Sequence, residues 1–187
     1  MVEPSIIQSR IKAFDYQSKI YPIIKQICLP LRLMDLHAFI HCKFYLESDN
    51  MCDRVLMISN NLETSSFITF EVFEHSQTFT NVHRSTKLNK VSYFFWTTET
   101  DDPALLKIFS KINLSSGVTI CKRFEGAIKT WSFGIENDNL NAFFNNNALI
   151  KLTQFVNYFE NSVLTLKLEE EDCCLHFPFK TDLSVKN

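Results

Sequence analysis

The sequence has 187 residues, 45% of them hydrophobic, and a formal net charge of −2. This length favours one domain with its own core, and the near balance of 19 basic and 21 acidic residues argues against a module that binds nucleic acid by itself. The low glycine count of 3, and the lack of a Walker A or dinucleotide motif, argue against a phosphate-cradling loop, so we expect no nucleotide cofactor.

The cysteines and the apolar segments predict a cytoplasmic protein without a metal or a membrane partner. None of the six cysteines forms a CxxC pair and no apolar signal peptide precedes the chain, so we expect buried, reduced thiols. Cys173, Cys174 and His176 cluster near the end, but a zinc site needs four ligands and a second pair is missing. No apolar run reaches the ~20 residues that span a bilayer.

The first half of the chain predicts a helix and then a hairpin. Apolar residues recur near helical spacing over 4–34, and Pro22 is expected to kink or break this helix. Residues 37–46 are rich in aromatic and other apolar side chains, which is typical of a strand. A polar turn leads to a returning strand over 54–59. A short helix is expected around 65–74.

The second half predicts further strands with a helix between them. Residues 91–96 form a short, strongly aromatic strand, and the Asp-Asp-Pro sequence at 101–103 is typical of a helix start. Two strands over 116–123 and 127–135 surround a turn at Gly126, which indicates a second hairpin.

A long helix with an apolar stripe is expected to end near Leu166. The acidic run at 169–172 then suggests that residues 167–187 form a linker. The fold class predicted from these elements is α/β. We expect one domain over 1–166, an α/β/α sandwich with a central five-stranded, mostly antiparallel sheet and helices on both faces.

Several short motifs follow this order of elements. A strand ends in Trp96, a helix starts at Pro103, and the sequence Ser-Gly-Val-Thr-Ile follows at 116–120. Gly126 and the Trp-Ser-Phe sequence at 131–133 come next. In this order the chain resembles the signal-binding domain of LuxR-type quorum-sensing regulators. The resemblance implies an acyl-homoserine-lactone ligand between the sheet and one layer of helices, and a homodimer. It also implies that the linker leads to a helix-turn-helix DNA-binding domain, which we expect to lie outside this chain.

The resemblance also assigns ligand-binding positions. Trp96 takes the place of the strand-end Trp that contacts the lactone carbonyl, and Asn81 falls where the family has an Asp that binds the amide of the signal. Ser132 falls near a polar pocket position, and Phe70 and Phe73 lie beside the places of a family Trp and Tyr. Without the Asp, a charge-assisted hydrogen bond of about 1.5–3 kcal/mol is missing. Two alternatives therefore stay open: the domain binds an unusual, more apolar signal, or it binds no signal.

The histidines, serines and cysteines of the sequence form no recognisable catalytic or metal-binding pattern. His37 and His41 are four residues apart on a predicted strand, which is too far apart to bind one metal ion, so His41 is instead a candidate for a hydrogen bond in the pocket. No serine lies in a nucleophile elbow, and no cysteine has an obvious histidine and asparagine setting. We therefore expect no enzymatic activity.

The leading hypothesis is a ligand-sensing regulatory domain of a LuxR-type transcription regulator. It would bind a small amphiphilic signal, either acyl-homoserine-lactone-like or divergent, and would control dimerisation and DNA binding. The expected partners are this signal and a second copy of the chain, with DNA reached through a further domain. The alternative is a ligand-free dimerisation or interaction module whose core is filled by its own aromatic side chains.

Overall fold

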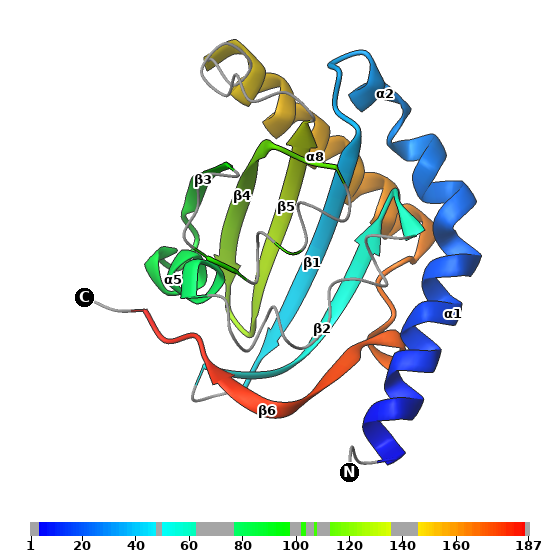
Figure 1. Cartoon of the computed structure of the whole chain (residues 1–187), viewed down its shortest axis with the longest axis vertical. Coiled ribbons are helices and arrows are strands. Elements are labelled where there is room, and N and C mark those ends of the chain that lie inside the picture. Colours follow the sequence, from blue (N-terminus) through cyan, green and yellow to red (C-terminus); the bar gives the residue numbers. More distant parts are fainter. Residues whose placement is uncertain are drawn as a thin grey trace.

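Figure 1 shows the computed structural model of the chain, which describes residues 4–47, 50–62, 77–97, 102, 103, 107, 113–135 and 146–185. The described residues form one antiparallel sheet of six strands in the order β3-β4-β5-β1-β2-β6. The strands are β1 (Ala38–Leu46), β2 (Met51–Ser59), β3 (Val91–Thr97), β4 (Ser116–Phe124), β5 (Ala127–Ile135) and β6 (Leu175–Asp182). The predicted α/β class is confirmed, whereas the predicted number of five strands is one too few.

The main helices lie on both faces of this sheet. They are α1 (Pro4–Ile27), α2 (Leu29–Arg32), α5 (Gln77–Ser85) and α8 (Asn146–Leu166), and a short 3-10 turn, η1, spans Glu171–Cys173. In Figure 1, α1 runs along the side of β2 and β6, and α8 crosses behind the sheet. The helix α1 continues through Pro22, and α2 follows it almost at once. No helix in the described ranges is long and apolar enough to cross a membrane.

The segment interpreted as a linker contributes a strand to the domain. β6 pairs with β2, with Leu175 opposite Val55, and Leu168 and Leu183 are buried on either side of this strand. The acidic run suggested a solvated segment, but the apolar residues around it have partners in the fold. Much of the stretch between residues 168 and 183 is therefore packed against the rest of the chain rather than free.

The face of the sheet that meets α1 and α8 is closed by aromatic packing. Phe39 and Phe133 are fully buried on β1 and β5 and meet Phe155 and Phe159 of α8. The ring centroids of Phe39 and Phe159 are 4.8 Å apart and the ring planes meet at 65°, an edge-to-face arrangement that aromatic pairs favour. Ile24 of α1 belongs to the same core. These contacts fix both helices on this face.

Charged side chains close the same face where α8 ends. Glu169 lies 2.9 Å from Lys43 Nζ and 2.8 Å from Lys129 Nζ, and Lys129 also binds Glu160 at 2.7 Å. His41 approaches Glu169 at 3.4 Å, which is an electrostatic contact rather than a well-formed hydrogen bond. Burial alone would raise the pKa of Glu169, but its contacts with His41, Lys129 and Lys43 outweigh this effect and hold the pKa well below its usual range.

This charged cluster is better explained by ion pairing than by metal binding. His41, Glu160 and Glu169 bring three potential metal ligands within 4.8 Å of one another. However, the ammonium groups of Lys43 and Lys129 already occupy both carboxylates. A divalent cation would have to displace these lysines, so we assign the cluster to holding α8 and the following segment against the sheet.

Arg123 organises the opposite face at the far end of β4. Its guanidinium is buried and donates to the backbone oxygens of His83 at 3.2 Å and Leu183 at 2.6 Å, and to Asn50 Oδ1 at 3.2 Å. The ring of His83 on α5 meets the ring of Phe44 on β1 at 4.6 Å. One side chain thus connects α5, the turn between β1 and β2, and the end of β6.

Replacing Glu169 by Gln tests the charged cluster. The folded pKa of Glu169 lies below its ordinary value of 4.5, so the carboxylate stabilises the fold above that pH, and this stability is lost as the pH falls further. We expect Glu169→Gln to lower the free energy of unfolding by about 2 kcal/mol at pH 7. The difference from the wild type should shrink below about pH 4.5, as measured by urea denaturation across pH.

The matched control is Glu171→Gln, which removes a charge from the same segment. Glu171 is 57% exposed and lies 3.7 Å from Arg54, so its loss should cost less than about 1 kcal/mol. Equal losses from the two substitutions, or a Glu169→Gln effect that does not change with pH, would contradict the assignment.

Candidate functional site

The second face of the sheet carries small, polar and apolar side chains in cross-strand rows. Phe94, Thr119, Ser132 and Ile40 lie opposite one another on β3, β4, β5 and β1. The neighbouring rows run through Trp96, Gly117, Gly134 and Ala38, and through Ser92, Cys121, Thr130 and Cys42. We call these three rows the hydroxyl face. Because side chains alternate along a strand, the hydroxyl face is the reverse of the face that meets α8.

A short chain of hydrogen bonds crosses the hydroxyl face. Trp96 Nε1 donates to Thr119 Oγ1 at 3.2 Å, and Thr119 Oγ1 lies 2.8 Å from Ser132 Oγ. All three side chains are half-buried, as are Ile40 and Phe94 beside them. A few aligned polar groups among apolar side chains are typical of a surface that binds and orients a small molecule.

Gly117 allows Trp96 to lie flat on β4. A Cβ atom at position 117 would overlap the six-membered ring of Trp96 and the backbone oxygen of Phe133. The next glycine along the row, Gly134, has the side chain of Leu114 above it. Because the two glycines have no side chains, they leave the space above the strands that the indole ring and Leu114 occupy.

The hydroxyl face is suited to binding rather than to nucleophilic attack. Each hydroxyl offers one donor and two acceptor positions, so the Thr119–Ser132 pair keeps hydrogen-bonding capacity after its contact with Trp96. Within the described ranges, no carboxylate or imidazole bonds to either hydroxyl to act as a base. The two hydroxyls can therefore form hydrogen bonds with a ligand, but no base among the described residues is present to turn either of them into a nucleophile.

The cysteines on this face are neutral. All six cysteines of the chain are free, as expected, and five of them are buried. Burial raises the pKa of Cys42 to about 12 and that of Cys121 to about 11. Both thiols stay protonated at neutral pH and act as small apolar groups in the row beside Thr119 and Ser132.

The structure places His41 on the opposite face from Trp96 and Ser132. Its ring stacks on Trp131 at 5.5 Å, and Nδ1 lies 3.1 Å from the backbone oxygen of Thr130. His41 is fully buried beside the charged cluster. Its neighbour on β1, Ile40, lies opposite Ser132 instead. The predicted pocket contact of His41 is therefore not on the face that carries Ser132.

Of the remaining predicted site residues, the structure describes Asn81, and it lies away from Trp96. Asn81 is exposed on α5, which packs near Arg123. Arg123 is six residues from Gly117 along β4, so about 20 Å separates the two ends of this strand. Phe70 and Phe73 lie outside the described residues.

Thr119 is the functional candidate that the sequence analysis did not select. It occupies the position between Trp96 and Ser132, and both of its hydrogen bonds join strands. The pattern in the sequence that could have indicated Thr119 is its place between Gly117 and Cys121, because alternate residues share one side of a strand.

Comparisons with known proteins identify the fold. No protein-family model matches the sequence, and no curated protein is significantly similar to it. The structure is similar to Escherichia coli SdiA, with a TM-score of 0.54 and 15% identity over 76% of this chain and 59% of that one. It is also similar to SdiA in complex with octanoyl-rac-glycerol, with a TM-score of 0.58 and 14% identity over 96% of this chain and 72% of that one.

These similarities show a shared fold. At 14–15% identity, they show that the chain has the fold of SdiA and carry no role of SdiA over to this chain. The chain spans 59% of the length of the first SdiA structure.

Gly117→Ala tests the fit between Trp96 and β4. The new methyl group would meet both an aromatic ring and a backbone oxygen, so we expect a loss of about 2 kcal/mol in the free energy of unfolding. Gly134→Ala is the matched control, because its methyl group would meet the flexible end of Leu114 and should cost about 1 kcal/mol or less. Urea denaturation followed by tryptophan fluorescence measures both. A larger loss for Gly134→Ala would be evidence against this packing.

Proposed function

We propose that the chain is a LuxR-type signal-binding domain that holds a small, neutral amphiphile against the hydroxyl face. The observation that carries this proposal is the hydrogen-bonded chain of Trp96, Thr119 and Ser132, half-buried among apolar side chains on a ligand-binding fold. A further support is that SdiA, which shares this fold, has been solved with octanoyl-rac-glycerol bound.

The chemistry of the hydroxyl face favours an uncharged head group. None of the side chains in its three rows carries a charge. A carboxylate placed there would lose its hydration without gaining an opposite charge, which is strongly unfavourable. An ester, amide or lactone carbonyl can instead accept from Ser132 or Thr119, while an acyl chain packs on Ile40 and Phe94. Monoacylglycerols and acyl-homoserine lactones both meet this description.

Binding in this position would act through stability and assembly. A ligand that binds only the native state adds to the free energy of unfolding in proportion to the logarithm of its concentration over the dissociation constant. The stabilised domain would then present a fixed surface to a second copy. Ile7, Ile11 and Phe14 form an exposed apolar stripe on α1, each about half exposed, that suits such an interface. DNA binding would come from a further domain, and this domain itself would perform no reaction.

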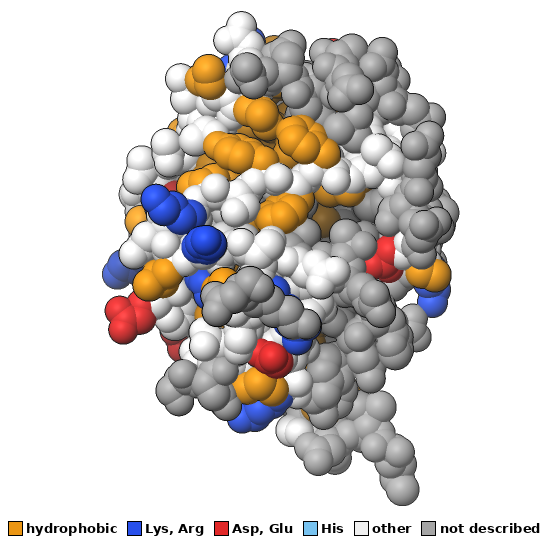
Figure 2. Space-filling view, turned by 90° about the vertical axis from the view of Figure 1, so that its left-hand side faces the viewer, with side chains coloured by type: hydrophobic (Ala, Val, Ile, Leu, Met, Phe, Trp, Pro, Cys, Tyr) orange, Lys and Arg blue, Asp and Glu red, His pale blue; other side chains and the backbone are white. Residues whose placement is uncertain are grey.

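The alternative function, a ligand-free interaction module, is favoured by a second exposed surface. Figure 2 shows apolar side chains gathered on the side of the molecule where edge strand β3 lies. Val91, Tyr93 and Phe95 of this strand are all exposed, and the Tyr93 hydroxyl lies 3.2 Å from Thr153 Oγ1 on α8. A chain that dimerises without any ligand would fit this alternative.

Calorimetry with octanoyl-rac-glycerol tests the proposed site. We expect saturable binding to the full chain, and Ser132→Ala should weaken it about fivefold because one hydrogen bond of about 1 kcal/mol is lost. Octanoate, which has the same acyl length but a charged head, should bind at least about tenfold more weakly.

The matched control is Ser162→Ala, which removes from α8 a half-buried hydroxyl that donates to the backbone oxygen of Tyr158. This variant should bind like the wild type. Saturable binding that Ser132→Ala leaves unchanged would place the ligand elsewhere. A chain that no acylglycerol or acyl-homoserine lactone stabilises, and that is dimeric alone, would support the interaction module.

A further inference from the structure

A hollow lies away from the hydroxyl face, between the end of α1 and the ends of two strands. It has a volume of about 580 Å³ and is partly open to solvent. One wall comes from α1 and α2, and the other comes from the residues just before β1 and just after β2. None of its lining residues belongs to the hydroxyl face.

The helical wall of this hollow is one continuous face. Tyr21, Lys25, Cys28 and Arg32 are spaced by four, three and four residues, and all four line the hollow. Residues three and four apart are neighbours on a helix surface, so α2 extends the face of α1. This spacing places the ammonium group of Lys25 and the guanidinium of Arg32 on the same wall.

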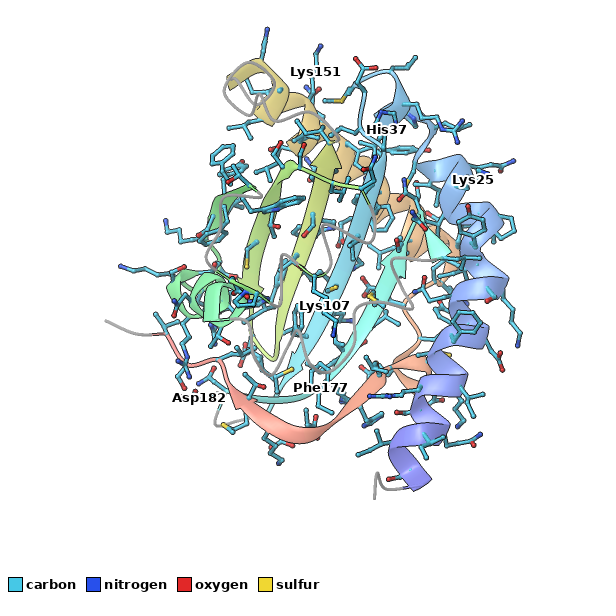
Figure 3. The ribbon with its side chains drawn as sticks, viewed as in Figure 1. Lys25, His37, Lys107, Lys151, Phe177 and Asp182 are labelled. Carbon is cyan, nitrogen blue, oxygen red and sulfur yellow. The ribbon has the colours of Figure 1, made fainter. Side chains whose placement is uncertain are left out.

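The opposite wall adds a third basic group. His37 lies just before β1, and Figure 3 labels it at the same end of the molecule as Lys25. Within the described part of the chain, neither Lys25 nor Arg32 forms an ion pair with a carboxylate. In a chain with a net charge of −2, two cations on one wall that form no ion pair among the described residues make a local positive site, with the imidazole of His37 on the opposite wall.

Helix dipoles explain only part of this arrangement. Lys25 lies in the last turn of α1 and Arg32 in the last turn of α2, where a positive charge interacts favourably with the helix end. That interaction is available from any side of a helix. It does not require both side chains to line the hollow that His37 faces.

The other wall also carries a fixed amide. Asn60 Oδ1 accepts from the backbone nitrogen of Phe39 at 2.9 Å, and its Nδ2 donates to the backbone oxygen of His37 at 3.4 Å. These bonds hold the carboxamide in place beside the hollow that Asn60 lines, and an amide nitrogen carries a second N–H that can donate to a ligand. The wall therefore offers an oriented neutral donor across from two cations.

We propose that this hollow binds a soluble small molecule through a phosphomonoester group. Two permanent positive charges, on Lys25 and Arg32, balance a phosphate monoester that carries a charge of about −2 at neutral pH, whereas a carboxylate would leave one of them unbalanced. The guanidinium fork can bind two phosphate oxygens, and the lysine acts as a point charge. Asn60 and His37 are placed to bind the remaining oxygens.

The rest of the hollow suits an organic group attached to the phosphate. Tyr21 and Leu36 supply an aromatic ring and a buried aliphatic side chain, and the volume lies within the range of small-molecule sites. The ligand would thus be a phosphorylated metabolite with a partly apolar body. This site is separate from the hydroxyl face, so the two binding claims succeed or fail independently.

An NMR titration of the full chain with phenyl phosphate at pH 7.5 and constant ionic strength tests this proposal. We expect saturable shifts of backbone amides in the ranges 21–37 and 60–62. Lys25→Gln and Arg32→Gln should each weaken binding about fivefold, the value of one partly exposed charge contact. Phenyl sulfate has the same shape with a single negative charge and should also bind at least about fivefold more weakly.

The matched control is Lys12→Gln, which removes one exposed charge from α1 outside the hollow. It should bind phenyl phosphate like the wild type. Shifts that do not saturate, equal binding of phenyl sulfate, or an equal loss in Lys12→Gln would overturn the proposal. Co-sedimentation with vesicles containing phosphatidic acid, abolished by Arg32→Gln, would overturn the soluble ligand and assign the site to a lipid headgroup.

Discussion

Strand β1 lies inside the sheet between β5 and β2, and its side chains alternate between two chemically different environments. His41 and Lys43 face α8, whereas Ile40 and Cys42 belong to the opposite face. A shift of one residue in register would exchange these sets. It would move a buried histidine and a lysine among uncharged side chains and remove them from Glu169. The ion pairs and aromatic contacts near α8 therefore fix the register on which the hydroxyl face depends.

The two faces of the sheet have different tasks because of this alternation. The face near α8 is filled by the packed rings around Phe39 and closed by the Lys43–Glu169–Lys129 contacts. The hydroxyl face has small residues, neutral thiols and two hydroxyls that retain hydrogen-bonding capacity. The basic hollow beside α1 adds a third chemistry at one end of the fold.

Much of the local structure follows from the sequence. The hairpin of β4 and β5 was indicated by Gly126, which has a φ of +72°, and the aromatic strand ending in Trp96 was also predicted. The link between Trp96 and Ser132 came from the resemblance. The face occupied by His41 depends on the register between β1 and β5, which periodicity along a single strand does not determine. The strand β6 was missed because the acidic run before it was interpreted as a solvated linker. The residue that ties this run to the sheet, Glu169, binds Lys129, which lies 40 residues away in the sequence.

The most direct test of the central claim is an isotope-filtered NOE experiment. Unlabelled octanoyl-rac-glycerol would be added to the full chain labelled with ¹³C and ¹⁵N. The account predicts contacts from the acyl chain to the Ile40 methyl groups and the Trp96 indole, and contacts from the glycerol head to Thr119. Contacts to Phe159 or Tyr16 on the α8 side, or a bound ligand without contacts to the hydroxyl face, would contradict it.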